Sequence, residues 1–123
     1  HIKPLQIALK THNLDCIFLV APTTTEARIQ AIAEHASGFV YYVSLKGVTG
    51  SAQLNTDEVG KKLSVLRRHI TLPIGVGFGI SDATSAAKIA SVADAVIVGS
   101  RIIKEIEQNA GRETESVSTL MRE

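Results

Sequence analysis

Short apolar runs alternate with amphipathic segments along this chain, and that alternation restricts the fold more than any other feature. Each run is rich in β-branched or aromatic residues: Cys16–Val20, Phe39–Val43, Pro73–Val76 and Ala95–Val98. Because both alternating sets of positions are apolar, each run is typical of a strand buried on both faces, as in a parallel sheet. Strands separated by helices indicate βαβ units with right-handed crossovers.

Helix-like segments lie between these runs and extend to both ends of the chain. Their apolar residues recur at three- and four-residue spacing, which gives each helix one face to bury. The faces are Ile2, Leu5 and Leu9; Ala27, Ile29, Ile32 and Ala33; Val59, Leu63 and Leu66; Ala83, Ala86, Ala87, Ile89 and Ala90; and Ile102, Ile103 and Ile106. Asn109-Ala110-Gly111 ends the fifth helix, and the tail from Arg112 to Glu123 is expected to form one more.

Composition narrows the class of protein. With 123 residues, the chain is long enough for one domain, and we expect residues 1–123 to form a single one. A hydrophobic fraction of 45% and a net charge of +1 indicate a globular protein without the basic field of a nucleic-acid binder. The single cysteine, Cys16, cannot build a disulfide framework, and we expect a packed thiol there.

The cellular setting follows from what the apolar runs lack. None approaches the roughly 20 residues that span a bilayer, and no targeting segment opens the sequence. We therefore expect a cytoplasmic protein with no membrane contact. Because the chain begins at His1 rather than at a methionine, we also expect it to be a piece of a longer protein.

A parallel array of four βα units has two common completions. One is a small open sheet with helices on both faces, in the flavodoxin-like style. The other is half of a (β/α)8 barrel, which normally needs about 250 residues. The length favours the open sheet, whereas the turns after the strands favour the barrel.

Glycine-rich turns follow the third and fourth apolar runs. They are Gly75–Asp82 and Val98–Arg101, and in both a strand passes into a helix. Without a Cβ, glycine lets backbone N–H groups approach an anion, and the helix N-terminus adds partial positive charge. Two such turns on neighbouring parallel strands favour a phosphate site, to which Ser100 adds a hydroxyl. The alternative is that the glycines serve only tight turns and close packing.

A long polar loop, Ser44–Gln53, follows the second run and contains two glycines. It is suited to be a lid over a site. Its pattern fits a solvated connection equally well.

Three motifs together resemble the tryptophan synthase alpha subunit: YYVSLKGVTG at Tyr41–Gly50, GVGFGIS at Gly75–Ser81 and VGSRI at Val98–Ile102. Their order and spacing match along essentially the whole chain. The resemblance covers the C-terminal half of that family's barrel, from the helix before its fifth strand to its last helix. It implies an α/β fold: the C-terminal half of a (β/α)8 TIM barrel, with four parallel strands alternating with helices.

The resemblance also implies a function in tryptophan, and hence aromatic amino-acid, biosynthesis. The family is a lyase that cleaves indole-3-glycerol phosphate to indole and glyceraldehyde 3-phosphate by an aldol-type reaction. Indole passes to a beta subunit in an alpha2-beta2 assembly. Pyridoxal phosphate belongs to that partner, so the alpha chain is expected to need no cofactor.

Site residues carry over position by position. Gly50, Gly79, Gly99 and Ser100 match phosphate-binding positions, and Phe78 and Ile80 match residues that flank them.

Tyr41 matches a tyrosine that lines the substrate pocket. With Phe39 and Val43 it forms the set of side chains that face the barrel interior, while Tyr42 faces the helices. Thr49 matches a loop threonine that meets a catalytic aspartate when the lid closes. Leu45 stands where some members carry arginine.

Both catalytic carboxylates of the family come from the N-terminal half, so we expect none in this segment and no activity from it alone. The carboxylates present suit structural roles: Asp82 a helix cap, Asp57 and Glu58 a first helical turn, and Asp15 and Asp94 the end of the sheet remote from the chemistry. No histidine has a partner at metal-ligand spacing, so no metal site is expected; the histidines are His1, His12, His35 and His69.

Two other functions stay open on the pattern alone. One is a non-catalytic phosphate-binding module with an open sheet, and the other is a structural piece. Whichever holds, the first and last apolar runs would be interior neighbours in a closed barrel. We therefore expect the isolated segment to self-associate through unpaired sheet edges.

Overall fold

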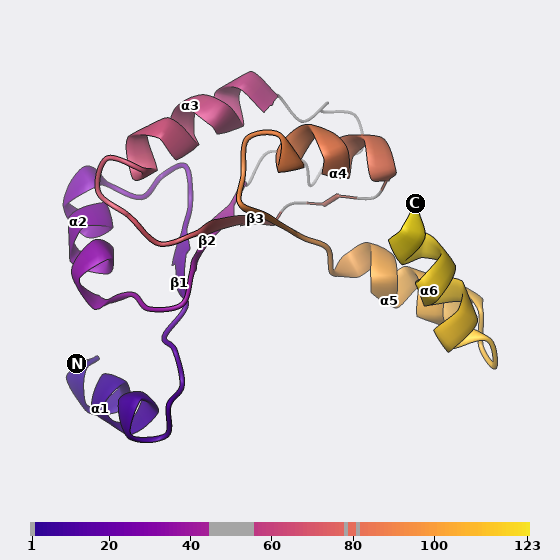
Figure 1. Cartoon of the computed structure of the whole chain (residues 1–123), viewed down its shortest axis with the longest axis horizontal. Coiled ribbons are helices and arrows are strands. Elements are labelled where there is room, and N and C mark those ends of the chain that lie inside the picture. The colour runs from indigo at the N-terminus through magenta and orange to yellow at the C-terminus, as the bar shows by residue number, and fades with distance from the viewer. Residues whose placement is uncertain (1, 45–55, 78, 81) are drawn as a thin grey trace.

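The computed structural model describes residues 2–44, 56–77, 79–80 and 82–123 (Figure 1). Within them, helices and strands alternate as the sequence predicts. The helices are α1 (Lys3–Thr11), α2 (Glu26–His35), α3 (Thr56–Leu66), α4 (Ala83–Ala90), α5 (Ser100–Gln108) and α6 (Glu113–Arg122). The strands are β1 (Phe18–Val20), β2 (Val40–Val43), β3 (Ile74–Gly77) and β4 (Ala95–Ile97).

The four strands of the described residues form one parallel sheet in the order β1-β2-β3-β4. Each strand pairs with the next one along the chain, so the order has no reversal of the kind found in a flavodoxin-like sheet. Consecutive parallel strands joined by helices are the repeating unit of a (β/α)8 barrel. The topology therefore favours the half-barrel over the open-sheet alternative.

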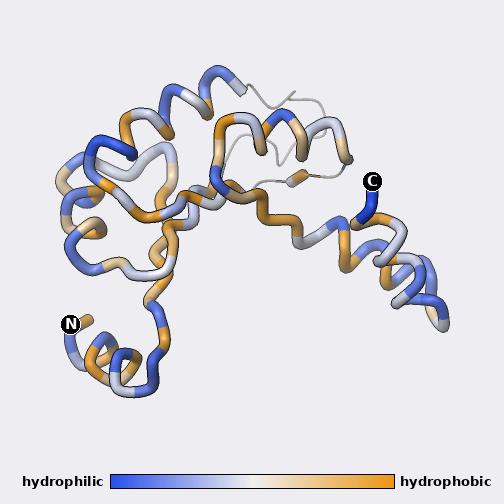
Figure 2. The backbone as a smooth tube through the Cα atoms, viewed as in Figure 1, coloured by the Kyte–Doolittle hydropathy of each residue, from blue (hydrophilic) through white to orange (hydrophobic). Residues whose placement is uncertain are grey.

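One face of the sheet packs against α2, α3 and α4 and forms the core. Val20, Tyr42 and Val76 are partners in the strand register and lie on this face, each no more than 3% exposed. The helices contribute the other buried side chains, among them Ile29, Ile32, Val59, Leu63, Leu66 and Ile89. Blue and orange alternate along each helix in Figure 2, as expected for amphipathic segments. Burial, followed by the nearby Glu58 carboxylate, raises the pKa of Tyr42.

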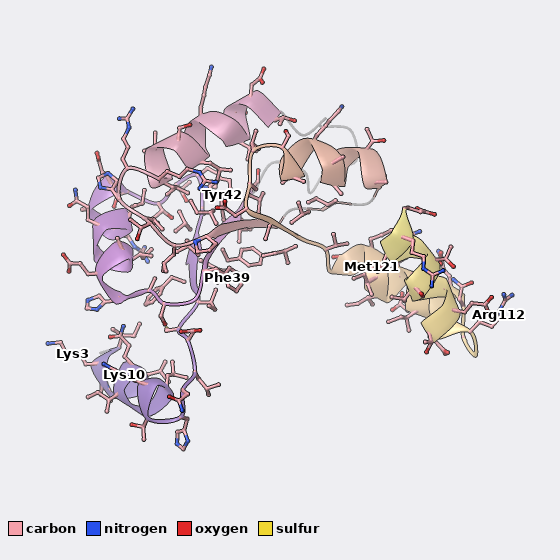
Figure 3. The ribbon with its side chains drawn as sticks, viewed as in Figure 1. Lys3, Lys10, Phe39, Tyr42, Arg112 and Met121 are labelled. Carbon is pink, nitrogen blue, oxygen red and sulfur yellow. The ribbon has the colours of Figure 1, made fainter. Side chains whose placement is uncertain are left out.

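The opposite face of the sheet carries the alternate residues of each strand. Figure 3 shows Phe39 on the opposite side of the sheet from Tyr42, and Tyr41 and Val43 share the parity of Phe39. The predicted division between Tyr41 and Tyr42 is therefore confirmed. On this face Leu19 is 65% exposed, and it lies on β1, which with β4 forms the two edges of the described sheet. Self-association through these edges stays a prediction.

The helices at the two ends lie away from the core. None of the residues of α1, α5 or α6 is fully buried. Figure 1 shows α1 beneath the sheet near the N-terminus, and α5 with α6 beyond β4. Gln6 of α1 donates to the carbonyl of His35 at 3.1 Å, which ties α1 to the end of α2. The helices of the described residues include none that is both long and apolar enough to cross a membrane.

Several predicted details are wrong at the level of single residues. Cys16 is half-buried and precedes β1, because its backbone N–H donates to the Ser37 hydroxyl at 3.1 Å rather than to a neighbouring strand. Four alanines assigned to buried helix faces are exposed, since the cores of α2 and α4 are filled by the larger isoleucines: Ala27, Ala83, Ala87 and Ala90. The predicted ends of the fifth helix and of the tail helix are confirmed.

Asp94 joins the amino-terminal ends of two strands to the end of a helix. Its carboxylate accepts from the Ile74 backbone N–H at 2.9 Å, while the Asp94 N–H donates to the Ile74 carbonyl at 3.1 Å. Arg67, just after α3, reaches the same carboxylate oxygen at 3.0 Å. The Ile74 amide, and after it Arg67, holds the pKa of Asp94 below its usual value, although burial acts in the opposite direction. Asp94 is thus structural, at the end of the sheet where the sequence predicted it.

We expect Asp94→Asn to lower the free energy of unfolding by about 1 kcal/mol at neutral pH, because a charge-assisted hydrogen bond is weakened at a site that is partly exposed. The folded-state pKa of Asp94 is lowered, so its contribution is complete above the unfolded-state pKa, about 3.9. It is lost as the pH falls through the folded-state value. Urea unfolding from pH 7 to pH 3 should show the two proteins converging in acid. Glu34→Gln, on the exposed side of α2, is the control, and an equal loss there would contradict the assignment.

Candidate functional site

The carboxyl ends of β3 and β4 bring two glycine turns to one edge of the sheet. The strands are parallel neighbours, so the turns that lead into α4 and α5 leave the sheet on the same side. Gly79 has a positive φ of +31°, and a Cβ added there would meet no atom of the described residues within 4 Å. Gly99, before α5, is equally open. Both predicted phosphate turns therefore expose backbone to free space at this edge.

The two helix starts at this edge differ in their caps. Asp82 caps α4: its carboxylate accepts from the Ser85 N–H at 2.8 Å and from the Ser85 hydroxyl at 2.9 Å. The cap of α5 is Gly99, which has no side chain to offer, and Ser100 is the first helical residue. The first N–H groups of a helix have no acceptor within the helix and attract anions. The start of α5 is consequently the better place for an anion, since α4 already has a carboxylate of its own.

Tyr41 lies over a strand that lacks side chains on the same face. A Cβ built on Gly77 would overlap the hydroxyl and ring of Tyr41, and one on Gly75 would lie 3.0 Å from Ile97 Cδ1. Tyr41 is paired in register with Gly75, but its ring lies against Gly77, two residues nearer the carboxyl end of β3. Sequence reasoning found Tyr41 but missed Gly77. The available signal was the glycine at every second position of the third run.

Ile80 lies on the helix side of this edge. It is only 6% exposed and belongs to the core cluster. It also lines an apolar pocket of about 140 Å³ between the start of α4, Val98 and the end of α6, where Met121 is labelled in Figure 3. The structure therefore separates Ile80 from Tyr41, which lies on the opposite face of the sheet.

Several predicted residues lie outside the described part of the chain: Leu45, Thr49, Gly50 and Phe78. The lid role of Thr49 and the phosphate role of Gly50 therefore stay predictions. Ser44, the last described residue before them, is buried, and its N–H donates to the Gly77 carbonyl at 3.4 Å. The loop thus begins beside the end of β3.

Two further titratable groups make structural contacts away from this edge. His69 lies 2.9 Å from a Glu26 carboxylate oxygen, which joins the segment after α3 to the start of α2. Glu105 accepts from Arg101 and Ser116 between α5 and α6. Among the described residues, no group of three or more His, Cys, Asp or Glu side chains could hold a metal ion. Among the described residues, the two turns offer backbone amides and the Ser100 hydroxyl, which suit binding of an anion.

Consecutive parallel βα units, with glycine turns gathered at the carboxyl ends of the strands, define this chain as a half-length unit of a (β/α)8 barrel enzyme fold. Comparisons with known proteins agree. The family model described as tryptophan synthase alpha chain matches residues 1–123. The alpha chain of Neisseria meningitidis serogroup B is 65% identical over 122 residues, which cover 99% of this chain and 47% of that protein.

Two solved structures extend the likeness to three dimensions. Tryptophan synthase subunit alpha from Legionella pneumophila has a TM-score of 0.83 and 32% identity, over 98% of this chain and 44% of that one. A chain of the tryptophan synthase complex from Pyrococcus furiosus has a TM-score of 0.79 and 27% identity. The match covers 100% of this chain and 48% of that one. The chain belongs to the tryptophan synthase alpha chain family, and it spans about half the length of the curated relatives it matches.

We expect Gly77→Ala to displace the Tyr41 ring and to lower the free energy of unfolding by about 1–3 kcal/mol, because the added methyl overlaps that ring. The Tyr41 ring resonances in an NMR spectrum, with urea unfolding, measure both effects. Gly99→Ala adds the same methyl where no atom of the described part of the chain lies within 4 Å, and it should leave the Tyr41 signals unchanged. Unchanged Tyr41 signals in Gly77→Ala would refute the packing.

Proposed function

We propose that this chain is the phosphate-binding part of a lyase, the tryptophan synthase alpha chain, which cleaves indole-3-glycerol phosphate to indole and glyceraldehyde 3-phosphate. Family membership supports the reaction. The observation that carries the site is the start of α5, where Gly99 leaves the helix N-terminus without a side-chain cap beside the open Gly79 turn. That arrangement suits a dianionic phosphate ester.

In this proposal each part of the edge has one task. The amides at Gly79, Gly99 and Ser100, with the Ser100 hydroxyl and the Gly50 turn, hold the phosphate and so fix the distance to the reacting carbon. Tyr41 lines the pocket for the rest of the substrate, and Phe78 and Ile80 support the phosphate turn. Thr49 closes over the site and orients a carboxylate. The bond between the indole ring and the glycerol chain breaks through acid–base groups outside this chain.

The proposed partner is a beta subunit that uses the released indole with pyridoxal phosphate, in an alpha2-beta2 assembly in the cytoplasm. The likeness to a chain of the Pyrococcus furiosus tryptophan synthase complex supports an assembly of this kind. The alpha chain itself needs no cofactor in this proposal. A non-catalytic phosphate-binding module is the competing function, and it shares the same phosphate site.

Titration of this chain with inorganic phosphate should shift the backbone amide signals of Gly79, Gly99 and Ser100 in NMR spectra. Ser100→Ala should weaken binding by about 0.5–1.5 kcal/mol, the contribution of one neutral hydrogen bond. Gly79→Val should weaken binding more, because a branched side chain at positive φ is strained and would enter the anion's space. Shifts confined to other amides would contradict the site.

The activity is tested by mixing this chain with the N-terminal half of the Neisseria meningitidis alpha chain and measuring release of indole from indole-3-glycerol phosphate. We expect release from the two halves together and none from either alone. Thr49→Val should lower turnover more than phosphate affinity, since a lid residue acts in the closed state. Phosphate binding without release from the associated halves would favour the non-catalytic module. Release from this chain alone would place the chemistry in it.

A further inference from the structure

Glu105 is the centre of a polar cluster between α5 and α6. Its carboxylate accepts from the Arg101 guanidinium one turn earlier and from the Ser116 hydroxyl on α6. Asn109 adds a third contact, since its side-chain amide donates to the Glu105 carboxylate at 3.1 Å and to the Glu105 carbonyl at 2.8 Å. The carboxylate therefore joins both ends of α5 to the neighbouring helix.

The cluster matters because α5 has little else to hold it. None of its residues is fully buried; Ile102 is half-buried, and its other two isoleucines, Ile103 and Ile106, are 58% and 42% exposed. Figure 1 shows α5 lying beyond β4 with α6 beside it, and α6 is its principal packing partner among the described elements. The direction of α5 is thus set mainly by its contacts with α6.

The end of helix α6 lies near the start of α4, which follows the Gly79 turn. Leu120 and Met121, near its end, line the apolar pocket that Ile80 and the start of α4 also line. Arg101 lines the same pocket with its side chain paired to Glu105, which has 17% of its side chain exposed. Glu105 is therefore linked through Ser116 and α6 to the pocket beside the start of α4.

The charge of Glu105 is maintained by the same partners. The Ser116 hydroxyl, followed by Arg101, lowers the pKa of the Glu105 carboxyl, while burial acts in the opposite direction. The carboxylate is ionised at neutral pH, and an ionised acceptor makes stronger and more directional hydrogen bonds than a neutral one.

We propose that Glu105 is a positioning residue: by joining Arg101 and Ser116 it fixes the first turn of α5, and so aims the amides of Ser100 and Arg101 at the phosphate. The proposal rests on the phosphate site of the proposed function. Glu105 itself does not touch the substrate. Its contribution is to preorganise backbone donors, which bind an anion well only when their directions are fixed before it arrives.

The test compares four variants of this chain: Glu105→Leu, Glu105→Gln, Ser116→Ala and Glu115→Leu. Glu115 is the matched control, because its carboxylate pairs at 3.2 Å with Arg112 at the N-cap of α6, is 69% exposed and does not join the two helices. Each variant is titrated with inorganic phosphate, and the NMR order parameters of the Ser100 and Arg101 amides are measured without phosphate. Urea unfolding establishes that every titration is made on folded protein.

We expect Glu105→Leu to raise the Kd for phosphate about three- to tenfold and to lower the order parameters at Ser100 and Arg101. Glu105→Gln should restore much of the affinity because its amide oxygen still accepts from Ser116 and Asn109. Ser116→Ala should reproduce part of the loss and covers the case in which Glu105→Leu does not fold. Unchanged affinity and order in these variants, or an equal loss in Glu115→Leu, would overturn the proposal.

Failure of the site itself gives a different result. If the unmodified chain shows no phosphate shifts at Ser100, the proposed phosphate site is wrong, and the order parameters alone decide the role of Glu105. Lower order at Ser100 in Glu105→Leu then supports positioning of the helix, and unchanged order refutes it.

Discussion

Parallel pairing of the strands is the constraint on which the rest of this structure depends. Parallel neighbours cannot be joined by a tight hairpin, so every connection crosses back as a helix. The helices α2, α3 and α4 consequently cover one face of the sheet, and all carboxyl ends of the strands meet at one edge. The core and the candidate site are therefore consequences of the same hydrogen-bond pattern, with structural contacts such as that of Asp94 at one end and open glycine turns at the other.

The two helix starts at the candidate site differ in their side-chain caps. The Asp82 side chain accepts from the Ser85 amide in the first turn of α4, whereas Gly99 offers the first amides of α5 no side-chain acceptor. A helix with glycine at its N-cap is less stable, by about a few tenths of a kcal/mol, than one capped by an Asp or Ser side chain. A helix that forgoes this stability, and that also lies outside the core, needs support elsewhere. The Glu105 cluster with α6 supplies that support within the described residues.

Local pattern was enough to predict the elements, because strand and helix periodicity act over a few neighbouring residues. It separated Tyr41 from Tyr42 and placed the cap Asp82 correctly. It could not find Asp94 or Glu105 as central groups, since their partners at Ile74 and Ser116 come close only through strand register or helix packing. The resemblance supplied the phosphate residues, but no local pattern showed that only one of the two glycine turns leads into a helix without a side-chain cap.

The contact between Tyr41 and Gly77 has a consequence for how the family can vary. Because β3 has no side chain at Gly77, the Tyr41 ring of β2 occupies the space that such a side chain would fill. A larger residue at position 77 would require a smaller or redirected side chain at position 41. The two positions therefore share one volume, although 35 residues separate them in the chain.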